Sequence, residues 1–477
     1  MPDSHDSTPR PFAIFNRLTI GELTKTWYGL LDLAKQAIGK KNGPTPQYER
    51  REDLKKIIND CIFARGGDVS ARNRTVELGT IYLGLSKEGR ENFHDILAKD
   101  FDVDTELRDN KIKELQQAVT VEERVQTEIA LKRALVPSRV RLLKQFSSLP
   151  NGFKFLIDMR ADLLHKTTDD PYIYKLSHDL KELLESWFDV GLLDLTEITW
   201  DSPAALLEKL IEYEAVHEIR SWDDLRKRLD SDRLCFAFFH NKMVREPIIF
   251  VEVALVKSLS DNIQELISRE GETHQAQEVT TAIFYSISNA QPGLAGISLG
   301  NFLIKTVVEK LSRERSHLKH FATLSPVPGF RNWLDKCLAS GDSSLLCSHD
   351  AKIIQKQYQC EDSIQKLKDL LDDDWTSDIE KSNFLKPILL SVCARYLLHE
   401  RRDNKALDPV MNFHLTNGAG LERINWLADI SDKGLKQSYG IMVNYYYNLS
   451  KIDSNHEQYI LTTKIATTRD VKNLLRK

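Results

Sequence analysis

The chain has 477 residues, of which 41% are hydrophobic and 29% charged, an ordinary composition for a protein that buries a large core. Its length predicts two or three domains at about 150 residues each. Sixty-six basic and 70 acidic residues give a net charge of -4, so no overall field favours nucleic acid or an anionic membrane. We therefore expect neither partner, and any anionic ligand must be held by local groups.

Residues 1–187 predict an α-helical domain, because apolar residues recur there at helical spacing. Residues 53–65 are amphipathic and precede Gly66-Gly67, which suit a left-handed helix end. Thr120 and Glu123 have the spacing of a capping box, in which each side chain satisfies a free backbone N–H. Neither a phosphate loop nor a nucleophile elbow occurs before residue 188. This half is interpreted as a scaffold with subunit contacts.

Residues 188–477 predict a mixed α/β domain, in which runs of β-branched and aromatic residues alternate with helical patterns. Ser202-Pro203 is typical of a helix start, with a capping serine and a proline at the first helical position. The polar stretch 270–278 is expected to form a solvent-facing loop. The expected strands are residues 192–200, 235–240, 247–256, 281–288 and 440–447.

The six cysteines are scattered, without a C-x-x-C pair or a His/Cys cluster at ligand spacing, which predicts reduced thiols and no metal site. The first ten residues are polar and lack the apolar core of a signal peptide, and Glu252 and Arg395 interrupt the longest apolar stretches. The final residues, Leu-Leu-Arg-Lys, are not a peroxisomal signal, and the first residues do not resemble a transit peptide. We expect a cytoplasmic protein of bacterial type without a membrane span.

A strand, a tight loop and a helix are expected in succession over residues 281–288, 289–296 and 298–311. Gly293 and Gly296 would let the backbone approach a ligand, and the N–H groups of the helix's first turn would attract a pyrophosphate. A simple turn explains the same residues. The arrangement resembles the acetyl-CoA loop of the GCN5-related N-acetyltransferase superfamily, although no single register places both its Gln or Arg and its first Gly correctly.

Two further segments carry side chains suited to catalysis. Ser325 precedes Pro326 and Pro328, so its backbone is stiff and its hydroxyl is held in place. A Ser-Pro pair that only starts a turn is the alternative. His414 stands among apolar residues close to Asn417, where an imidazole serves either in catalysis or as a buried structural group.

Together these segments resemble the malonyl-CoA decarboxylase family. The similarity is most specific over residues 288–305, 324–330, 412–419 and 438–445, and it extends more diffusely through residues 155–164, 214–217 and 221–222, so that it covers nearly the whole chain. The resemblance implies an α-helical oligomerisation domain over residues 1–187, followed by a catalytic domain of acetyltransferase-like fold over residues 188–477.

The resemblance also implies the site. Ser325 and His414 would form the catalytic pair, with Asn417 and Tyr447 in support. Ser298 stands where some relatives carry an acidic residue, so we assign it no acid or base role. Malonyl-CoA would be the substrate, no cofactor would be needed beyond this CoA thioester, and the protein would be a homo-oligomer, either a dimer or a tetramer. The CoA loop would comprise Ala295, Gly296, Ile297, Ser298, Leu299, Gly300 and Asn301.

Decarboxylation of a malonyl thioester leaves an enolate, which must be stabilised at oxygen and protonated at carbon. Backbone N–H groups near the loop, Ser325 or Asn417 could donate to the oxygen, at about 2.7 to 4 kcal/mol per donor. We expect His414 to give the proton, because imidazole ordinarily titrates near neutral pH. Ser325 would bind the malonyl carboxylate or relay a proton. The alternatives are an acyl-CoA-dependent acetyltransferase and a non-catalytic scaffold that holds CoA.

Overall fold

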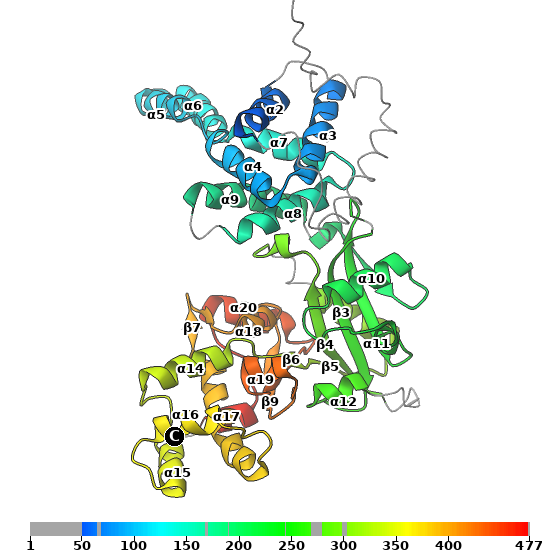
Figure 1. The fold of residues 1–477 in the computed structure, drawn as a ribbon, viewed down its shortest axis with the longest axis vertical. Helices are drawn as coiled ribbons and strands as arrows, with labels where there is room; N and C mark the ends of the chain where they lie inside the picture. Colours follow the sequence, from blue (N-terminus) through cyan, green and yellow to red (C-terminus); the bar gives the residue numbers. More distant parts are fainter. Residues whose placement is uncertain are drawn as a thin grey trace, which may run out of the picture. The chain divides into compact units, whose positions relative to one another are not determined.

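The computed structural model describes residues 50–63, 68–166, 170–188, 190–243, 245–268, 279–297 and 303–475. Its contacts divide the chain into two compact units (Figure 1). The first comprises Met1–Asp189 with the segments His240–Val244 and Gln291–Ile297, and the second comprises Val190–Phe239, Arg245–Ala290 and Ser298–Lys477. A domain boundary between residues 187 and 188 remains a prediction. No helix in the described ranges is long and apolar enough to cross a membrane.

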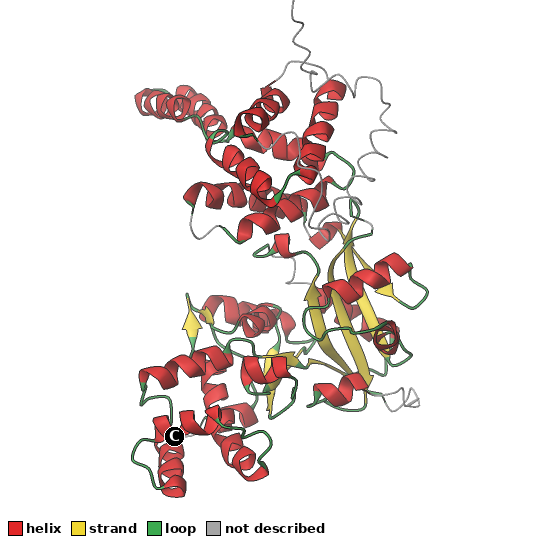
Figure 2. Ribbon diagram, viewed as in Figure 1, coloured by secondary structure: helices red, strands yellow, loops and turns green. Residues whose placement is uncertain are grey.

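The first unit is built of helices in its described part (Figure 2). The capping box at Thr120 and Glu123 is confirmed. Gly66 and Gly67 lie outside the described residues. Helices α5 and α6 form a hairpin that buries little, since α5 has no buried residue and α6 only Ala134. The helices are α2 (Arg51–Phe63), α3 (Asp68–Gly84), α4 (Lys87–Lys99), α5 (Thr105–Gln117), α6 (Val121–Ala134), α7 (Ser138–Ser147), α8 (Gly152–Leu164) and α9 (Pro171–Trp187).

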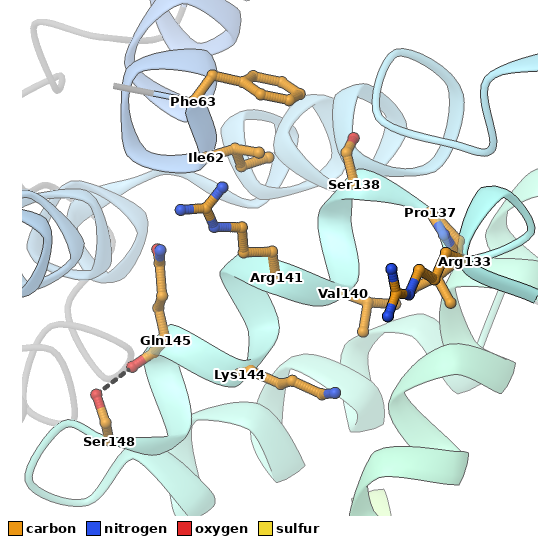
Figure 3. Close-up of a pocket in the computed structure, with 11 residues that line it drawn as sticks. Ile62, Phe63, Arg133, Pro137, Ser138, Val140, Arg141, Lys144, Gln145 and Ser148 are labelled. Atoms are coloured by element: carbon orange, nitrogen blue, oxygen red, sulfur yellow. Dashed lines mark hydrogen bonds between the residues drawn. The ribbon is translucent and has the colours of Figure 1, made fainter. Parts of the chain in front are cut away.

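An open groove of about 700 Å³ lies on the first unit, where the end of α2 meets α7 and the end of α6 (Figure 3). Its cationic side chains are Arg133, Arg141 and Lys144, and the apolar wall includes Ile62 and Phe63. None of the site residues that the sequence predicts lines this groove.

The second unit contains a mixed sheet in the order β1-β2-β3-β4-β5-β10-β6, with β9 paired to β10. Strands β2, β3 and β4 are antiparallel, β4 and β5 are parallel, and β10 runs antiparallel to β5, β6 and β9. The strands are β1 (Leu193–Ile198), β2 (Arg233–His240), β3 (Pro247–Val256), β4 (Thr281–Asn289), β5 (His320–Thr323), β6 (Ser325–Pro326), β9 (Gly420–Asn425) and β10 (Met442–Tyr446).

A small hairpin of β7 (Arg401–Arg402) and β8 (Lys405–Ala406) forms a separate sheet. Apolar residues of α10 and α11 pack against β2 and β3, while α12 packs with β3, β4, β5 and β10. The helices are α10 (Ala204–Tyr213), α11 (Trp222–Arg228), α12 (Ile263–Ser268), α13 (Leu303–Glu314), α14 (Phe330–Ser340), α15 (Ser348–Tyr358), α16 (Ser363–Asp372), α17 (Ile379–His399), α18 (Pro409–Thr416), α19 (Asp432–Ser438), α20 (Ile452–Thr462) and α21 (Arg469–Leu474).

The five predicted strands are confirmed, as β1, β2, β3, β4 and β10. Strands β5, β6 and β9 were not predicted, because the first two are very short and the two apolar residues of β9, Leu421 and Ile424, are three positions apart, a spacing that does not indicate a strand. The predicted start of α10 is partly wrong. Pro203 is the extended cap residue and not the first helical residue, and Ser202 Oγ accepts from the Thr199 N–H at 3.1 Å. The predicted loop 270–278 lies outside the described residues.

Glu252, which interrupts the apolar run of β3, is buried and accepts a hydrogen bond from Arg228 of α11 at 3.0 Å. The pKa of Glu252 is raised to about 8, mainly by burial and in addition by the nearby carboxylate of Glu214. The charged residue that breaks the hydrophobic pattern therefore binds a helix to the sheet.

Gly418 directs the chain out of α18 with φ +79°, and a Cβ on it would lie 2.2 Å from the carbonyl oxygen of Ile452. We expect Gly418→Ala to lower the free energy of unfolding by about 2 kcal/mol or more, because both the left-handed backbone and the contact oppose a side chain. Urea unfolding measures the loss. Gly341→Ala is the matched control, since Gly341 has φ +65° and open space around it. An equal loss in both variants would contradict the role of the Ile452 contact.

Candidate active site

Ser325 lies where β10 joins two short strands. Strand β5 ends at Thr323, and β6 begins at Ser325, which pairs with Val443 of β10. Beyond β10, the Tyr447 N–H donates to the carbonyl of Phe321 at 2.8 Å. Strand β10 therefore fixes both Ser325, which pairs with it, and Tyr447, which follows its last residue.

His414 comes from α18, a helix with strong signals at both ends. Asp408 caps its start by accepting from the Met411 N–H at 2.9 Å, and Pro409 follows in the first turn. The helix ends at Asn417, after which Gly418 turns away with positive φ. These short-range signals place His414 in the last turn of α18.

The structure brings three predicted side chains into one hydrogen-bonded series. Ser325 Oγ lies 3.0 Å from His414 Nε2, and His414 Nδ1 lies 2.8 Å from the hydroxyl of Tyr447. All three residues are buried, His414 with 1% of its surface exposed. The ring of Tyr445 stacks on the imidazole at a centroid distance of 4.4 Å. Residues 89 positions apart thus form a contact that suits proton transfer, while their catalytic roles remain a prediction.

Burial changes the charge of the imidazole. It lowers the pKa of His414 to about 3, because the charged form loses its hydration and no carboxylate among the described residues is bonded to the ring. The sequence argument used the ordinary value near neutrality. In the folded protein the ring is neutral at physiological pH, so it acts through hydrogen bonds and a movable proton and not as a resident cation.

Thr323 belongs to this series, although the sequence reasoning missed it. Ser325 Oγ donates to Thr323 Oγ1 at 2.8 Å, and the Tyr445 N–H donates to the same oxygen at 3.1 Å. Since Ser325 has a single proton and gives it to Thr323, the neutral imidazole must carry its proton on Nε2 and accept from Tyr447 at Nδ1. The spacing of two residues along an extended segment was the signal that could have identified Thr323.

Asn417 closes the end of α18 and also has a buried side-chain oxygen. Its Nδ2 donates to the carbonyl of Phe413 at 2.8 Å, which closes the end of α18. Its Oδ1 is buried and has no hydrogen-bond partner within the described residues. Because Nδ2 carries two N–H donors and this contact uses one of them, the expectation that Asn417 donates to an enolate oxygen stays a prediction.

The predicted CoA loop is described only in part. Ala295, Gly296 and Ile297 follow a short 3-10 helix, η2 (Pro292–Leu294), and Gly296 has φ +75°. The N–H groups of Ala295 and Ile297 donate within the loop, to Pro292 and Leu294, both at 3.0 Å. These two amides are thus already used. Ser298, Leu299, Gly300 and Asn301 lie outside the described residues.

Glutamate and serine side chains form a second buried polar cluster in the same unit. Ser286 Oγ and Ser288 Oγ of β4 donate to the carboxylate of Glu214, at 2.8 and 3.1 Å. The N–H groups of Val216 and His217 donate to it as well, both at 2.8 Å. This carboxylate holds the turn after α10 against β4. Among the described residues, no group of three or more His, Cys, Asp or Glu side chains could hold a metal ion.

We expect the imidazole of His414 to stay neutral at pH 5, because its pKa is lowered to about 3 by burial. Nitrogen-15 NMR of labelled histidine reports the charge of each ring, and the spectrum of His414→Asn assigns the signal. A His414 midpoint above about 5.5 would contradict the burial argument.

Comparison with known proteins shows to which family the chain belongs. A model of the malonyl-CoA decarboxylase C-terminal domain matches residues 191–477, and one of the N-terminal domain matches residues 101–188. The mitochondrial malonyl-CoA decarboxylase of Anser anser anser is 37% identical over 418 residues, which cover 84% of this chain and 83% of that protein. The mitochondrial enzyme of that name from Rattus norvegicus is 35% identical over 448 residues, which cover 91% and 88%.

Solved structures agree with these relatives. Malonyl-CoA decarboxylase from Rhodopseudomonas palustris is 38% identical with a TM-score of 0.81, over 89% of this chain and 99% of that chain. The structure from Agrobacterium vitis is also 38% identical, with a TM-score of 0.79 over 89% and 100%. Since both family models match and the relatives cover most of the sequence, the chain belongs to the malonyl-CoA decarboxylase family.

Proposed function

We propose that this chain is a carboxy-lyase that converts malonyl-CoA to acetyl-CoA and CO₂, with Ser325 and His414 as its catalytic pair. Family membership supports the reaction. The observation that carries the assignment of residues is the buried contact of 3.0 Å between Ser325 Oγ and His414 Nε2. A hydroxyl and a neutral imidazole in contact, shielded from water, form a unit that can hold and move one proton.

The reaction requires an electron sink and a proton. Cleavage of the bond to the carboxylate releases CO₂ and leaves an electron pair that the thioester carbonyl delocalises as an enolate. Ser325 gives its hydroxyl proton to the carbon, while Nε2–H of His414 donates to Oγ and stabilises the alkoxide that forms. The reaction consumes one proton overall, which solvent returns to Oγ of Ser325, so that the hydroxyl and the imidazole are both restored. Burial raises the pKa of Tyr447 well above its usual value, so its hydroxyl stays protonated and keeps donating to Nδ1.

Tertiary features beyond the pair support further parts of the proposal. The parallel strands β4 and β5, joined through η2 and α13, support an acetyltransferase-like fold in which the loop from Ala295 to Asn301 binds CoA. The substrate is a CoA thioester and no separate cofactor takes part. We also propose a homo-oligomeric state, as a dimer or tetramer, and a cytoplasmic location.

The test is an assay with malonyl-CoA and without any acyl acceptor. The wild-type protein should release CO₂ and form acetyl-CoA, whereas Ser325→Ala and His414→Asn should lower kcat by roughly 10²- to 10⁴-fold, the usual range for lost acid–base catalysis. Ser340→Ala and His349→Asn are matched controls at exposed positions of the same unit and should keep full activity.

Other outcomes decide between functions. An acetyltransferase that uses the same loop would be silent in this assay until an amine acceptor is added, and a CoA-binding scaffold would be silent in both conditions. Wild-type rates in Ser325→Ala or His414→Asn would refute the proposed catalytic pair while leaving the reaction itself intact.

Thr323 is expected to position the Ser325 hydroxyl. Thr323→Val keeps the shape but removes the oxygen that Ser325 donates to, so kcat should fall by roughly threefold to tenfold with KM unchanged, as for one lost hydrogen bond. Thr323→Ser should restore most of the rate, because it restores the oxygen. If the serine variant is as slow as the valine variant, the effect comes from packing and not from the hydroxyl.

A further inference from the structure

Helix α8 in the first unit holds the glycine-rich segment that precedes the predicted CoA loop. A Cβ on Gly293 would lie 1.8 Å from the carbonyl oxygen of Ile157 in α8, so only glycine fits this contact. The guanidinium of Arg160, one turn further along α8, donates through Nη1 to the Gly293 carbonyl. The helical half of the sequence therefore shapes η2 directly.

Arg160 carries more charge and donor capacity than this contact uses. Only 3% of the residue is exposed, and its Nε has no hydrogen-bond partner within the described residues. None of the ion pairs found among those residues involves Arg160. Burial lowers the pKa of its guanidinium, an effect that Glu185 partly opposes. A buried cation without a bonded anion is costly, and such a group is commonly retained where a ligand supplies the missing charge.

A second cation lies at the other end of the same segment. Cε of Lys181, in α9, would be 3.9 Å from a Cβ on Gly296, whose φ of +75° lets the backbone turn there without a side chain. The ammonium of Lys181 lies 3.3 Å from Glu185, with about a third of its side chain exposed. Arg160 and Lys181 thus approach the two ends of segment 293–296, and among the described residues the carboxylate that acts on both cations is that of Glu185.

We propose that Arg160 and Lys181 bind a phosphate group of the CoA substrate beside Gly296. This inference rests on the proposed function and extends it, because it gives the helical half a part in substrate binding. The Arg160 fork provides a second donor beside the one fixed on Gly293, and phosphate is the anion that such a fork fits. The N–H groups of Ala295 and Ile297 are already used within the loop, so side-chain cations can supply an attraction for phosphate that these two amides cannot.

The experiment compares two substrates that differ in phosphate. Malonyl-CoA carries a diphosphate and a 3′-phosphate, whereas malonyl-pantetheine carries none and presents the same reacting end. With malonyl-CoA, Arg160→Met should raise KM by roughly tenfold to a hundredfold without changing kcat, as for a lost charge-assisted hydrogen bond. With malonyl-pantetheine, wild type and variant should have the same kcat/KM. Lys181→Met should show the same selectivity with a smaller rise, because its side chain is more exposed.

Controls separate charge from structure. Arg160→Lys keeps a cation and should recover part of the affinity for malonyl-CoA. Arg141→Met removes an exposed cation from the groove on the first unit and should change neither substrate's kinetics. The shift in melting temperature on adding CoA, dephospho-CoA or inorganic phosphate identifies the phosphate involved. A site for the 3′-phosphate would lose its Arg160-dependent shift with dephospho-CoA, whereas a diphosphate site would keep it.

Each failure has a distinct meaning. If Arg160→Met lowers kcat/KM equally for both substrates, Arg160 only holds η2 in place and the inference is wrong, while the decarboxylase proposal stands. If the wild-type protein releases no CO₂ from either substrate but its melting temperature rises with CoA in an Arg160-dependent way, the proposed reaction is wrong and the phosphate site stands.

Discussion

The exclusion of water from one imidazole is the constraint on which the proposed chemistry depends. His414 has 1% of its surface exposed, and this burial keeps its ring neutral far below physiological pH. A neutral ring accepts at one nitrogen and donates at the other, so the hydroxyls on both sides must orient accordingly. Ser325 and Tyr447 therefore have fixed directions of donation, which a solvated and partly charged histidine would not impose.

The sheet supplies the precision that this arrangement needs. Strand β10 pairs with β5, β6 and β9, and its neighbours hold Thr323 and Ser325 while its end leads into Tyr447. Only the imidazole comes from a helix, α18, whose capping residue and terminal glycine fix its length. Placing most members of a hydrogen-bonded series on one strand and its partners limits their relative motion, which favours catalysis by positioning.

Helix α8, in the helical half of the sequence, contacts Gly293 just before the predicted CoA loop, and a role as a scaffold alone does not require this contact. The carbonyl of Ile157 leaves no room for a side chain on Gly293, and Arg160 binds the carbonyl of that glycine. A glycine between a strand and a helix is usually explained by backbone freedom, but here the reason is close packing against another helix. The same packing buries the guanidinium, so the contact that shapes the segment also places a buried positive charge beside it.

The sequence by itself determined the local features: the helices of the first half, the capping box at Thr120, five strands, and the choice of Ser325 and His414. These follow from periodicity, end signals and motif resemblance, which are properties of neighbouring residues. Only the tertiary structure decided which atoms meet and in what environment. The neutral ring of His414 and its contacts with Ser325 and Tyr447 depend on burial and on partners elsewhere in the chain. A pKa and a free donor are set by solvent exclusion and contact, which no local pattern encodes.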